Sequence, residues 1–219
     1  DFGWEDIKNL TYQLDQNPNN IEQHFDVDKG IWFLALNNLF VNLDSYIGPF
    51  CQNYYLFQDD NSRFLPVVWD FNESFGHFSM INTPGPGNPP ATTQDLQEMD
   101  PFLRDGDATR PLCNILFADP TYRKMYVAHM KTIMDEFFSN NYYHQKADSL
   151  HSTISAAFQS DQNTFYTWNQ ATQNITTSVT GGGGPGGGTK VGITELMNAR
   201  TTYILAQTEF LYPTPDISN

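Results

Sequence analysis

The chain has few basic residues and no long apolar run, and both shortages exclude functions. Its 219 residues hold 11 Lys and Arg against 25 Asp and Glu, a formal net charge of −14. Such a balance argues against binding to nucleic acid or to an anionic membrane surface. No apolar stretch approaches the roughly 20 residues that a transmembrane helix needs, and no signal peptide is recognisable at Asp1, where the sequence begins without Met. We therefore expect no membrane insertion, and a mature product or a fragment.

Cysteine is also scarce, since the chain contains only Cys51 and Cys113. Two cysteines cannot by themselves form a four-ligand metal site. They are either two buried thiols or one disulfide in an oxidising compartment. We favour the disulfide, because Cys51 directly precedes an expected strand and Cys113 lies on a helix expected to pack behind it. The low Lys content and the acidic pI, with abundant Asn, Gln, Thr and Tyr, point to an exported protein.

The sequence does contain enough apolar and aromatic residues for an ordered core, at 39% hydrophobic and 15% aromatic. Residues 28–43 are apolar on nearly every side after a potential N-cap, Asp28, which predicts a core helix. The aromatic and β-branched runs 53–57 and 63–69 flank the polar turn QDDNS and predict a β-hairpin. Further helices are expected over ATRPLCNILFA, DPTYRKMYVAHMKTIMDEFF (N-cap Asp119), the less apolar and peripheral YHQKADSLHSTISAAFQSD, and GITELMNARTTYILAQTEFL. The predicted fold class is α+β, mainly α.

Two segments are expected to be loops. Residues 81–100 are rich in Pro, Gly, Thr and Gln, which predicts a long loop. Residues 180–190 contain the run GGGGPGGG, but the Gly-Lys-Ser/Thr ending of a phosphate-binding loop is absent and Lys190 follows a Thr. The glycine run therefore predicts a flexible surface loop.

Three oxygen-bearing side chains stand beside heavily apolar sequence. Asp44 follows the predicted core helix, Asn53 begins the first predicted strand, and Asp70 ends the apolar run RFLPVVW. Burying a lone carboxylate costs several kcal/mol, so a hard cation such as Mg²⁺ would explain their grouping. The alternative is that Asp44 caps a turn, Asn53 bonds the backbone, and Asp70 pairs with Arg63 or Arg110.

The stretch NNLFVNLDSYIGPFCQNYYLFQDDNSRFLPVVWDFNESFG resembles the core signature of the CotH family, the spore-coat-type atypical protein kinases. The family pattern is an Asn-x-Asp, then Asn-Tyr-Tyr-Leu, then a Trp-Asp-x-Asp/Asn run, preceded by Pro, that ends in Phe-Gly. The segments RPLCNILFADPTYRKMYVAHM and GITELMNARTTYIL are similar to the family's later helices. The resemblance runs from about Asp28 to Leu205.

This resemblance implies a role for each matching residue. Asp44 matches the catalytic aspartate, and Asp70 matches the metal-binding aspartate that corresponds to the Asp of the protein-kinase Asp-Phe-Gly motif. Asn53 matches the family's Asn, a second metal ligand or an orienter of Asp44, and Asn72 would complete the metal site. Trp69 would lie beside bound nucleotide. The implied cofactors are ATP and Mg²⁺ or Mn²⁺.

The chain departs from the family pattern at two positions. Asn72 stands where many relatives have Asp, which removes one charge from the metal site, and Gln52 stands where His is common. Only 43 residues precede Asp44, and neither Lys8 nor Lys29 lies on a recognisable strand. We therefore expect residues 1–219 to form a single kinase-like large (C-terminal) lobe without the small lobe.

Two functions follow from this resemblance. The first is transfer of phosphate from ATP to Ser or Thr of an extracellular or envelope protein by a secreted or cell-surface kinase. The alternative is a non-catalytic, pseudokinase-like interaction module that contacts a partner subunit of a surface assembly. Asn72 and the absent small lobe favour the module, whereas the retained trio Asp44, Asn53 and Asp70 favours the enzyme.

Overall fold

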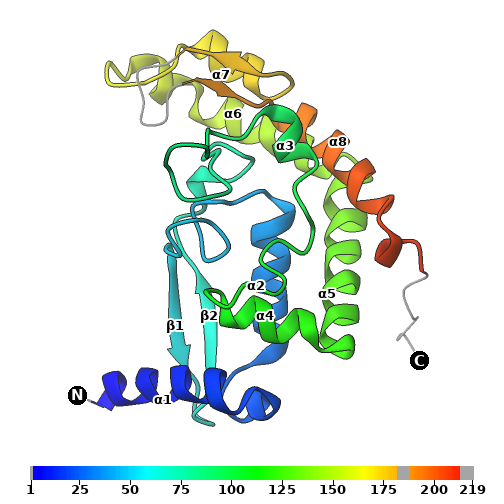
Figure 1. The fold of residues 1–219 in the computed structure, drawn as a ribbon. Helices are drawn as coiled ribbons and strands as arrows, with labels where there is room; N and C mark the ends of the chain where they lie inside the picture. The colour runs from blue at the N-terminus through cyan, green and yellow to red at the C-terminus, as the bar shows by residue number, and fades with distance from the viewer. Residues whose placement is uncertain (1, 182–187, 213–219) are drawn as a thin grey trace.

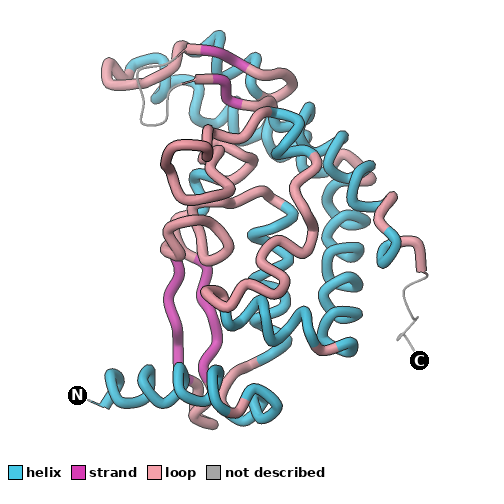
Figure 2. The backbone as a smooth tube through the Cα atoms, viewed as in Figure 1, coloured by secondary structure: helices cyan, strands magenta, loops and turns pink. Residues whose placement is uncertain are grey.

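The computed structural model describes residues 2–181 and 188–212, and it is mainly helical with two small antiparallel sheets (Figures 1 and 2). The predicted α+β, mainly α, class is confirmed. The elements are α1 (Phe2–Gln16), η1 (Pro18–Gln23), α2 (Val27–Leu39), β1 (Tyr54–Gln58), β2 (Phe64–Val68), η2 (Phe71–Glu73), α3 (Thr93–Gln97), α4 (Pro111–Ala118), α5 (Pro120–Ile133), the π-helical turn η3 (Met134–Phe138), α6 (Tyr142–Ser160), α7 (Trp168–Asn174), β3 (Val179–Thr180), β4 (Thr189–Lys190), α8 (Ile193–Leu205) and η4 (Thr208–Phe210).

Helix α2 is the core helix that its all-round apolar sequence predicts. It packs against β2 on one side and against α5 on the other, so the hairpin, α2 and α5 form successive layers (Figure 1). The predicted cap was wrong, because the helix begins two residues earlier and Asp26 accepts the Lys29 N–H at 3.1 Å. Asp28 instead accepts from His129 Nε2 at 2.7 Å, and this contact ties α2 to α5.

The hairpin also lies where the sequence predicts it. Strands β1 and β2 pair antiparallel with Tyr54 opposite Val68 and Gln58 opposite Phe64. Tyr54 packs edge-on against Phe33 of α2, whereas Tyr55 and Phe57 point outward and are exposed. The alternation follows from the two-residue period of a strand with one covered face.

The C-terminal helices follow the expected pattern. Asp119 caps α5, since its carboxylate accepts the N–H groups of Thr121 and Tyr122. Helix α6 is peripheral, with Tyr143 as its buried residue, and α8 returns to the core. The core is built from apolar side chains of four helices: Ile31, Leu34, Leu39, Leu112, Leu116, Met130, Ile133, Leu196, Met197 and Ile204.

Four findings correct or extend the sequence predictions. Helix α1 forms over residues for which we made no prediction. The expected loop 81–100 contains α3, because Thr92 and Asp95 form a reciprocal capping box. Strands β3 and β4 pair on either side of the glycine run, of which residues 182–187 lie outside the described residues. Cys51 and Cys113 are free thiols, so the predicted disulfide is not formed.

The two thiols have different surroundings. Cys113 is fully buried on α4, and burial raises the pKa of its thiol far above the usual value. Cys51 is half-buried in a left-handed backbone conformation (φ 52°) just before β1. Cys113 therefore acts as an apolar core side chain.

Candidate functional site

Asp44 lies in the loop that joins α2 to β1, and it is held by two amides. Its carboxylate accepts a hydrogen bond from Gln52 Nε2 at 2.5 Å and another from Asn53 Nδ2 at 2.8 Å. The same Nδ2 donates to the Asp44 backbone carbonyl at 2.9 Å. Asp44 is half-buried, so the carboxylate is fixed in direction and still reachable from solvent.

Asn53 has a defined amide orientation, because both of its Asp44 partners are acceptors and only an NH₂ group can satisfy them. The Asn53 Oδ1 is consequently directed away from those bonds as an acceptor. Asn53 adopts φ 58°, a conformation that Asn tolerates better than most residues. The structure thus brings Asp44 and Asn53 together and leaves an amide oxygen available for a cation.

Asp70 stands at the same end of the hairpin as Asn53. Tyr54 pairs with Val68, so the next residues outward are Asn53 on one strand and Trp69 on the other, and Asp70 follows Trp69. Asp70 is exposed and left-handed (φ 53°, ψ 58°), and its side chain does not cap η2. Within residues 2–181 and 188–212 its carboxylate has no hydrogen-bond or ion-pair partner.

The alternative pairing of Asp70 with an arginine was wrong. The Arg63 guanidinium contacts Asp59 at 3.2 Å and Asp26 at 3.9 Å, at the turn end of the hairpin. Arg110 donates to backbone carbonyls of the Asp44 loop. No hydrogen bond joins Asp70 to Asp44 or Asn53, so the convergence of all three groups around a ligand stays a prediction.

Trp69 and Asn72 flank Asp70 and face solvent. Trp69 is 55% exposed and contacts Tyr55 edge-on at 5.2 Å between ring centroids. Both rings lie on the uncovered face of the hairpin. Asn72 is exposed in the η2 turn. Both side chains are therefore free to contact a ligand at this end of the hairpin.

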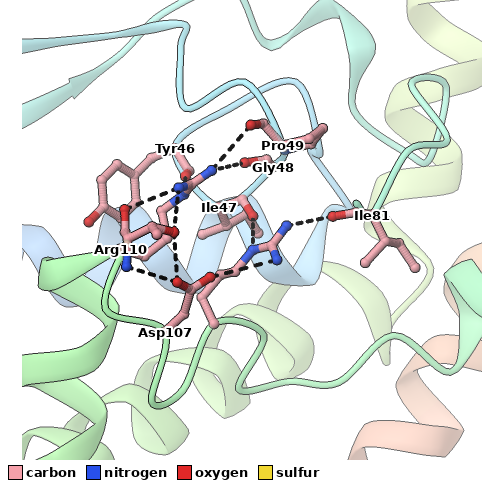
Figure 3. Close-up of polar contacts among 9 residues, drawn as sticks. Tyr46, Ile47, Gly48, Pro49, Ile81, Asp107 and Arg110 are labelled. Carbon is pink, nitrogen blue, oxygen red and sulfur yellow. Dashed lines mark hydrogen bonds and ion pairs between the residues drawn. The ribbon is translucent and has the colours of Figure 1, made fainter. Parts of the chain in front are cut away.

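Two arginines from a distant segment hold the loop that follows Asp44 (Figure 3). Arg110 donates from Nε to the Tyr46 carbonyl at 2.8 Å and from Nη2 to the Gly48 carbonyl at 2.6 Å. Arg104 donates from Nε to the Ile47 carbonyl at 2.9 Å. The loop cannot form regular backbone hydrogen bonds, and the guanidinium donors replace them. Local sequence carried no signal for these roles, because each Arg is 57 or more positions from its partner.

A buried polar network lies beneath the same loop. Asn42 donates to the Asn37 Oδ1 at 3.0 Å, and Ser45 Oγ donates to the Asn42 carbonyl at 2.6 Å. Arg200 of α8, fully buried, donates to the Asn38 Oδ1 at 2.6 Å. Its other donors bond the Asn38, Leu39, Leu96 and Met99 carbonyls. Arg200 therefore fixes the C-terminal end of α2.

Backbone strain gathers in the segments that carry these residues. Six non-glycine residues between positions 41 and 75 have positive φ. Ser62 lies in the hairpin turn, and the other five flank the site: Val41, Cys51, Asn53, Asp70 and Phe75. Each such residue costs roughly 1–3 kcal/mol and persists only when its surroundings over-determine it. Val41, a β-branched residue, is held by its fully buried side chain and by the bond from Gly76 N to its carbonyl at 3.2 Å. Such strain concentrates at functional sites, which supports this location.

The donors at this site suit a hard divalent cation. Asp70, Asn53 and Asn72 offer one carboxylate and two amide oxygens, which are ligand atoms that Mg²⁺ prefers. Across the described residues no group of three or more His, Cys, Asp and Glu side chains could hold a metal by itself. Mg²⁺ commonly binds one or two carboxylates together with substrate phosphates, so one Asp side chain and two amides fit a metal–nucleotide complex.

The order of Asp44, Asn53 and Asp70 along the chain is typical of a protein kinase. An Asp, then an Asn at the start of a hairpin, then an Asp at the hairpin's exit is also the order of residues in a kinase catalytic segment. The sequence profile of the CotH kinase protein family matches residues 2–181, and the chain belongs to this family. The match takes in α1, which the resemblance from Asp28 onward did not include. No curated protein and no solved structure matched. No helix in the described part of the chain is long and apolar enough to cross a membrane.

Proposed function

We propose that this CotH family chain forms the large lobe of an atypical protein kinase that transfers the γ-phosphoryl group of ATP to a Ser or Thr hydroxyl of an extracellular or envelope protein. One observation carries the proposal. At the open end of the β1–β2 hairpin, Asp44 is held by Asn53 while the Asp70 carboxylate, just beyond the opposite strand, has no partner among the described residues. A purely structural role for Asp70 would require a partner.

Asp44 would act on the acceptor hydroxyl. Its carboxylate is oriented by Gln52 and Asn53 and accepts the hydroxyl hydrogen bond. The acceptor oxygen attacks the γ-phosphorus, the bond to the β–γ bridging oxygen breaks, and the hydroxyl proton leaves toward Asp44, giving a phosphoester and ADP. The arginine-held loop keeps Asp44 in place, and positioning is the main contribution that a kinase makes.

Asp70, Asn53 and Asn72 would hold Mg²⁺ or Mn²⁺ with the ATP phosphates, and Trp69 would border the nucleotide. The bound cation would neutralise phosphate charge, which a protein of net charge −14 otherwise repels. Asn72 supplies an oxygen without a charge. The metal site would therefore depend more on Asp70 than a site in which position 72 is an Asp.

Composition supports the proposed location and partners. Low Lys, high Asn, Gln and Thr content and a pI near 4.4 suit a secreted or cell-surface protein. The partner would be a protein substrate or a subunit of a surface assembly, and the acidic charge disfavours nucleic acid.

A second candidate is a non-catalytic, pseudokinase-like interaction module. The observation that favours it is Asn72, whose neutral amide gives the metal site fewer charges. Such a module would bind metal and nucleotide weakly, or bind without transfer.

The test is Mg²⁺-dependent ATP binding by the full-length protein, measured calorimetrically for wild type, Asp70→Asn and the matched control Asp60→Asn. Asp60 is an exposed aspartate in the turn at the opposite end of the same hairpin. We expect Asp70→Asn to abolish binding with the melting temperature unchanged, and Asp60→Asn to behave as wild type. Equal ATP binding by all three proteins would refute the site. Binding lost in Asp70→Asn, with no phosphoryl transfer in wild type, would favour the module.

A further inference from the structure

A pocket of about 550 Å³ lies between α6, α7, the β3–β4 hairpin and the segment after η2. None of Asp44, Asn53 or Asp70 lines it. Its volume falls within the range of about 300–1,000 Å³ that is usual for small-molecule sites. The pocket is therefore a second candidate site, separate from the proposed phosphoryl-transfer site.

One wall is an apolar stripe of α6. The stripe consists of side chains at helical spacing: Tyr143, Ala147, Leu150, Ile154 and Phe158. Leu150 is 63% exposed and Ile154 is 48% exposed, although an isolated surface helix would place polar residues there. Ile175 and Val179 stand among the residues of the other wall. The stripe therefore presents a long apolar surface to whatever enters the pocket.

The floor is aromatic and fixed. Phe40 and Phe75 line it, their rings meet edge-on at 5.4 Å between centroids, and the Phe75 N–H donates to the Phe40 carbonyl. Phe40 also packs on Phe138 of η3 at 5.4 Å between centroids. A floor anchored in this way keeps the pocket open without a ligand, as preformed sites require.

The charge of the lining is opposite to that of the whole chain. The described lining contains no Asp or Glu, in a protein with 25 of them, but it contains Lys146, Lys190, His77 and His151. Lys190 is nearly buried and donates to the His77 carbonyl at 2.8 Å, while the His77 ring is paired with Glu73 at 2.6 Å. Lys146 lies over the Tyr142 ring at 5.3 Å, and no described carboxylate is within ion-pair distance of it. Lys146 is therefore the cation available to a ligand.

We propose that this pocket binds an amphiphilic anion: a single apolar chain that lies along the α6 stripe, with a carboxylate head beside Lys146. The apolar walls select the chain, because burying Leu150 and Ile154 against it removes apolar surface from water. Lys146 selects the sign of the head group, since the negative potential of the rest of the protein repels anions elsewhere on its surface. The proposal does not depend on the proposed kinase function.

The test is calorimetric titration of the full-length protein with dodecanoate, dodecanol and dodecyltrimethylammonium. The two ions are kept below their critical micelle concentrations, and dodecanol is kept below its solubility limit. We expect saturable 1:1 binding of dodecanoate and about tenfold weaker binding of the other two, which corresponds to one charge-assisted contact. Lys146→Gln should lower dodecanoate affinity to that of dodecanol. Leu150→Gln should weaken all three ligands, and the matched control Leu211→Gln, at another exposed leucine, should change nothing.

Three outcomes would overturn the proposal. They are absence of saturable dodecanoate binding, equal affinity for the three head groups, and affinities that do not respond to Lys146→Gln and Leu150→Gln. Sedimentation of the same proteins adds a further criterion. Self-association that Leu150→Gln abolishes and dodecanoate does not affect would mean that a second copy of the chain covers the stripe. Melting curves establish that each variant is folded.

Discussion

The two ends of the β1–β2 hairpin each carry an aspartate, and the two carboxylates differ in their hydrogen-bond partners. At the turn end, Asp59 accepts the backbone N–H groups of Arg63 at 2.8 Å and Asn61 at 2.9 Å, and it also contacts the Arg63 guanidinium. These bonds lower the pKa of Asp59 below its usual value, and the hydrogen bond from the Arg63 backbone N–H has the largest effect. At the open end, Asp70 has no such donor among the described residues.

The presence or absence of these donors distinguishes a carboxylate with a structural role from one that is available to bind a ligand. The Asp59 carboxylate accepts hydrogen bonds from residues of the turn itself, so it stabilises the turn. Asp70 has a strained left-handed backbone conformation, and no hydrogen bond from its side chain to the cap of η2 compensates for the strain. A residue in that condition is better explained by a ligand than by packing.

The two ends also differ in how their loops are supported. The turn itself is held by contacts that span at most four positions, such as Arg63 with Asp59, and Arg63 also lies 3.9 Å from the Asp26 carboxylate. The loop that leads into the open end is held by Arg104 and Arg110, which reach back 57 and 64 positions to the Ile47 and Tyr46 carbonyls. The turn could form in a short peptide, whereas the open end requires the folded chain.

The largest effect is expected from Asp44→Asn. The amide cannot accept the hydroxyl proton, so phosphoryl transfer should fall by about 10²–10⁴-fold while Mg²⁺-dependent ATP binding remains. The rate of phosphoryl transfer is measured as autophosphorylation of the full-length protein, detected by the radiolabel that it takes up from γ-labelled ATP. Asp60→Asn at the turn end should keep wild-type activity. Unchanged transfer in Asp44→Asn would remove Asp44 from the mechanism.

Arg110→Met tests the long-range support of the open end. Arg110 is nearly buried, and its loss leaves the Tyr46 and Gly48 carbonyls without donors. At about 1–3 kcal/mol for each unsatisfied group, the free energy of unfolding should fall by about 3 kcal/mol. Arg63→Met at the exposed turn end should cost only about 0–1 kcal/mol. Urea denaturation of both variants gives the comparison, and equal losses would contradict it.

Asp70→Gly tests the strain at the open end. Glycine adopts φ 53° without a Cβ penalty of about 1–2 kcal/mol, but loses about 0.5–1 kcal/mol through its more flexible unfolded state. We expect the variant to be more stable by about 0.5 kcal/mol and to lose Mg²⁺-dependent ATP binding. Asp60→Gly, at a position without positive φ, should be destabilised. A less stable Asp70→Gly would show that the carboxylate supports the fold.

The smallest effect concerns the pH dependence of the turn end. The pKa of Asp59 is depressed in the folded state relative to 3.8 in the unfolded chain, so its stabilising effect is complete above about pH 4 and is lost as pH falls through the folded pKa. Wild type should therefore melt higher than Asp59→Asn near neutral pH, and the two melting temperatures should converge in acid. Asp70→Asn should match wild type near neutral pH. A constant gap between wild type and Asp59→Asn would contradict the assignment.

The amino-acid sequence alone predicts those parts of the structure that depend on neighbours along the chain. The hairpin follows from aromatic and β-branched runs around a polar turn, and the predicted runs 53–57 and 63–69 differ from the strands by one residue at each end. Asp119 was predictable as the α5 cap because its partners are two and three residues away. The pattern from Asp44 to Asp70 also sufficed to identify the family.

Tertiary structure decided which of several equivalent residues is used. Asp26 and Asp28 are both suitable caps for α2, and packing of α5 decided the matter by placing His129 beside Asp28. Arg110 was a possible partner for Asp70, but it bonds carbonyls in the turns of the Asp44 loop. Arg200 likewise bonds carbonyls at the end of α2. Local hydrogen bonds are encoded within about four positions, whereas a buried guanidinium bonds whichever acceptors the packed helices bring to it.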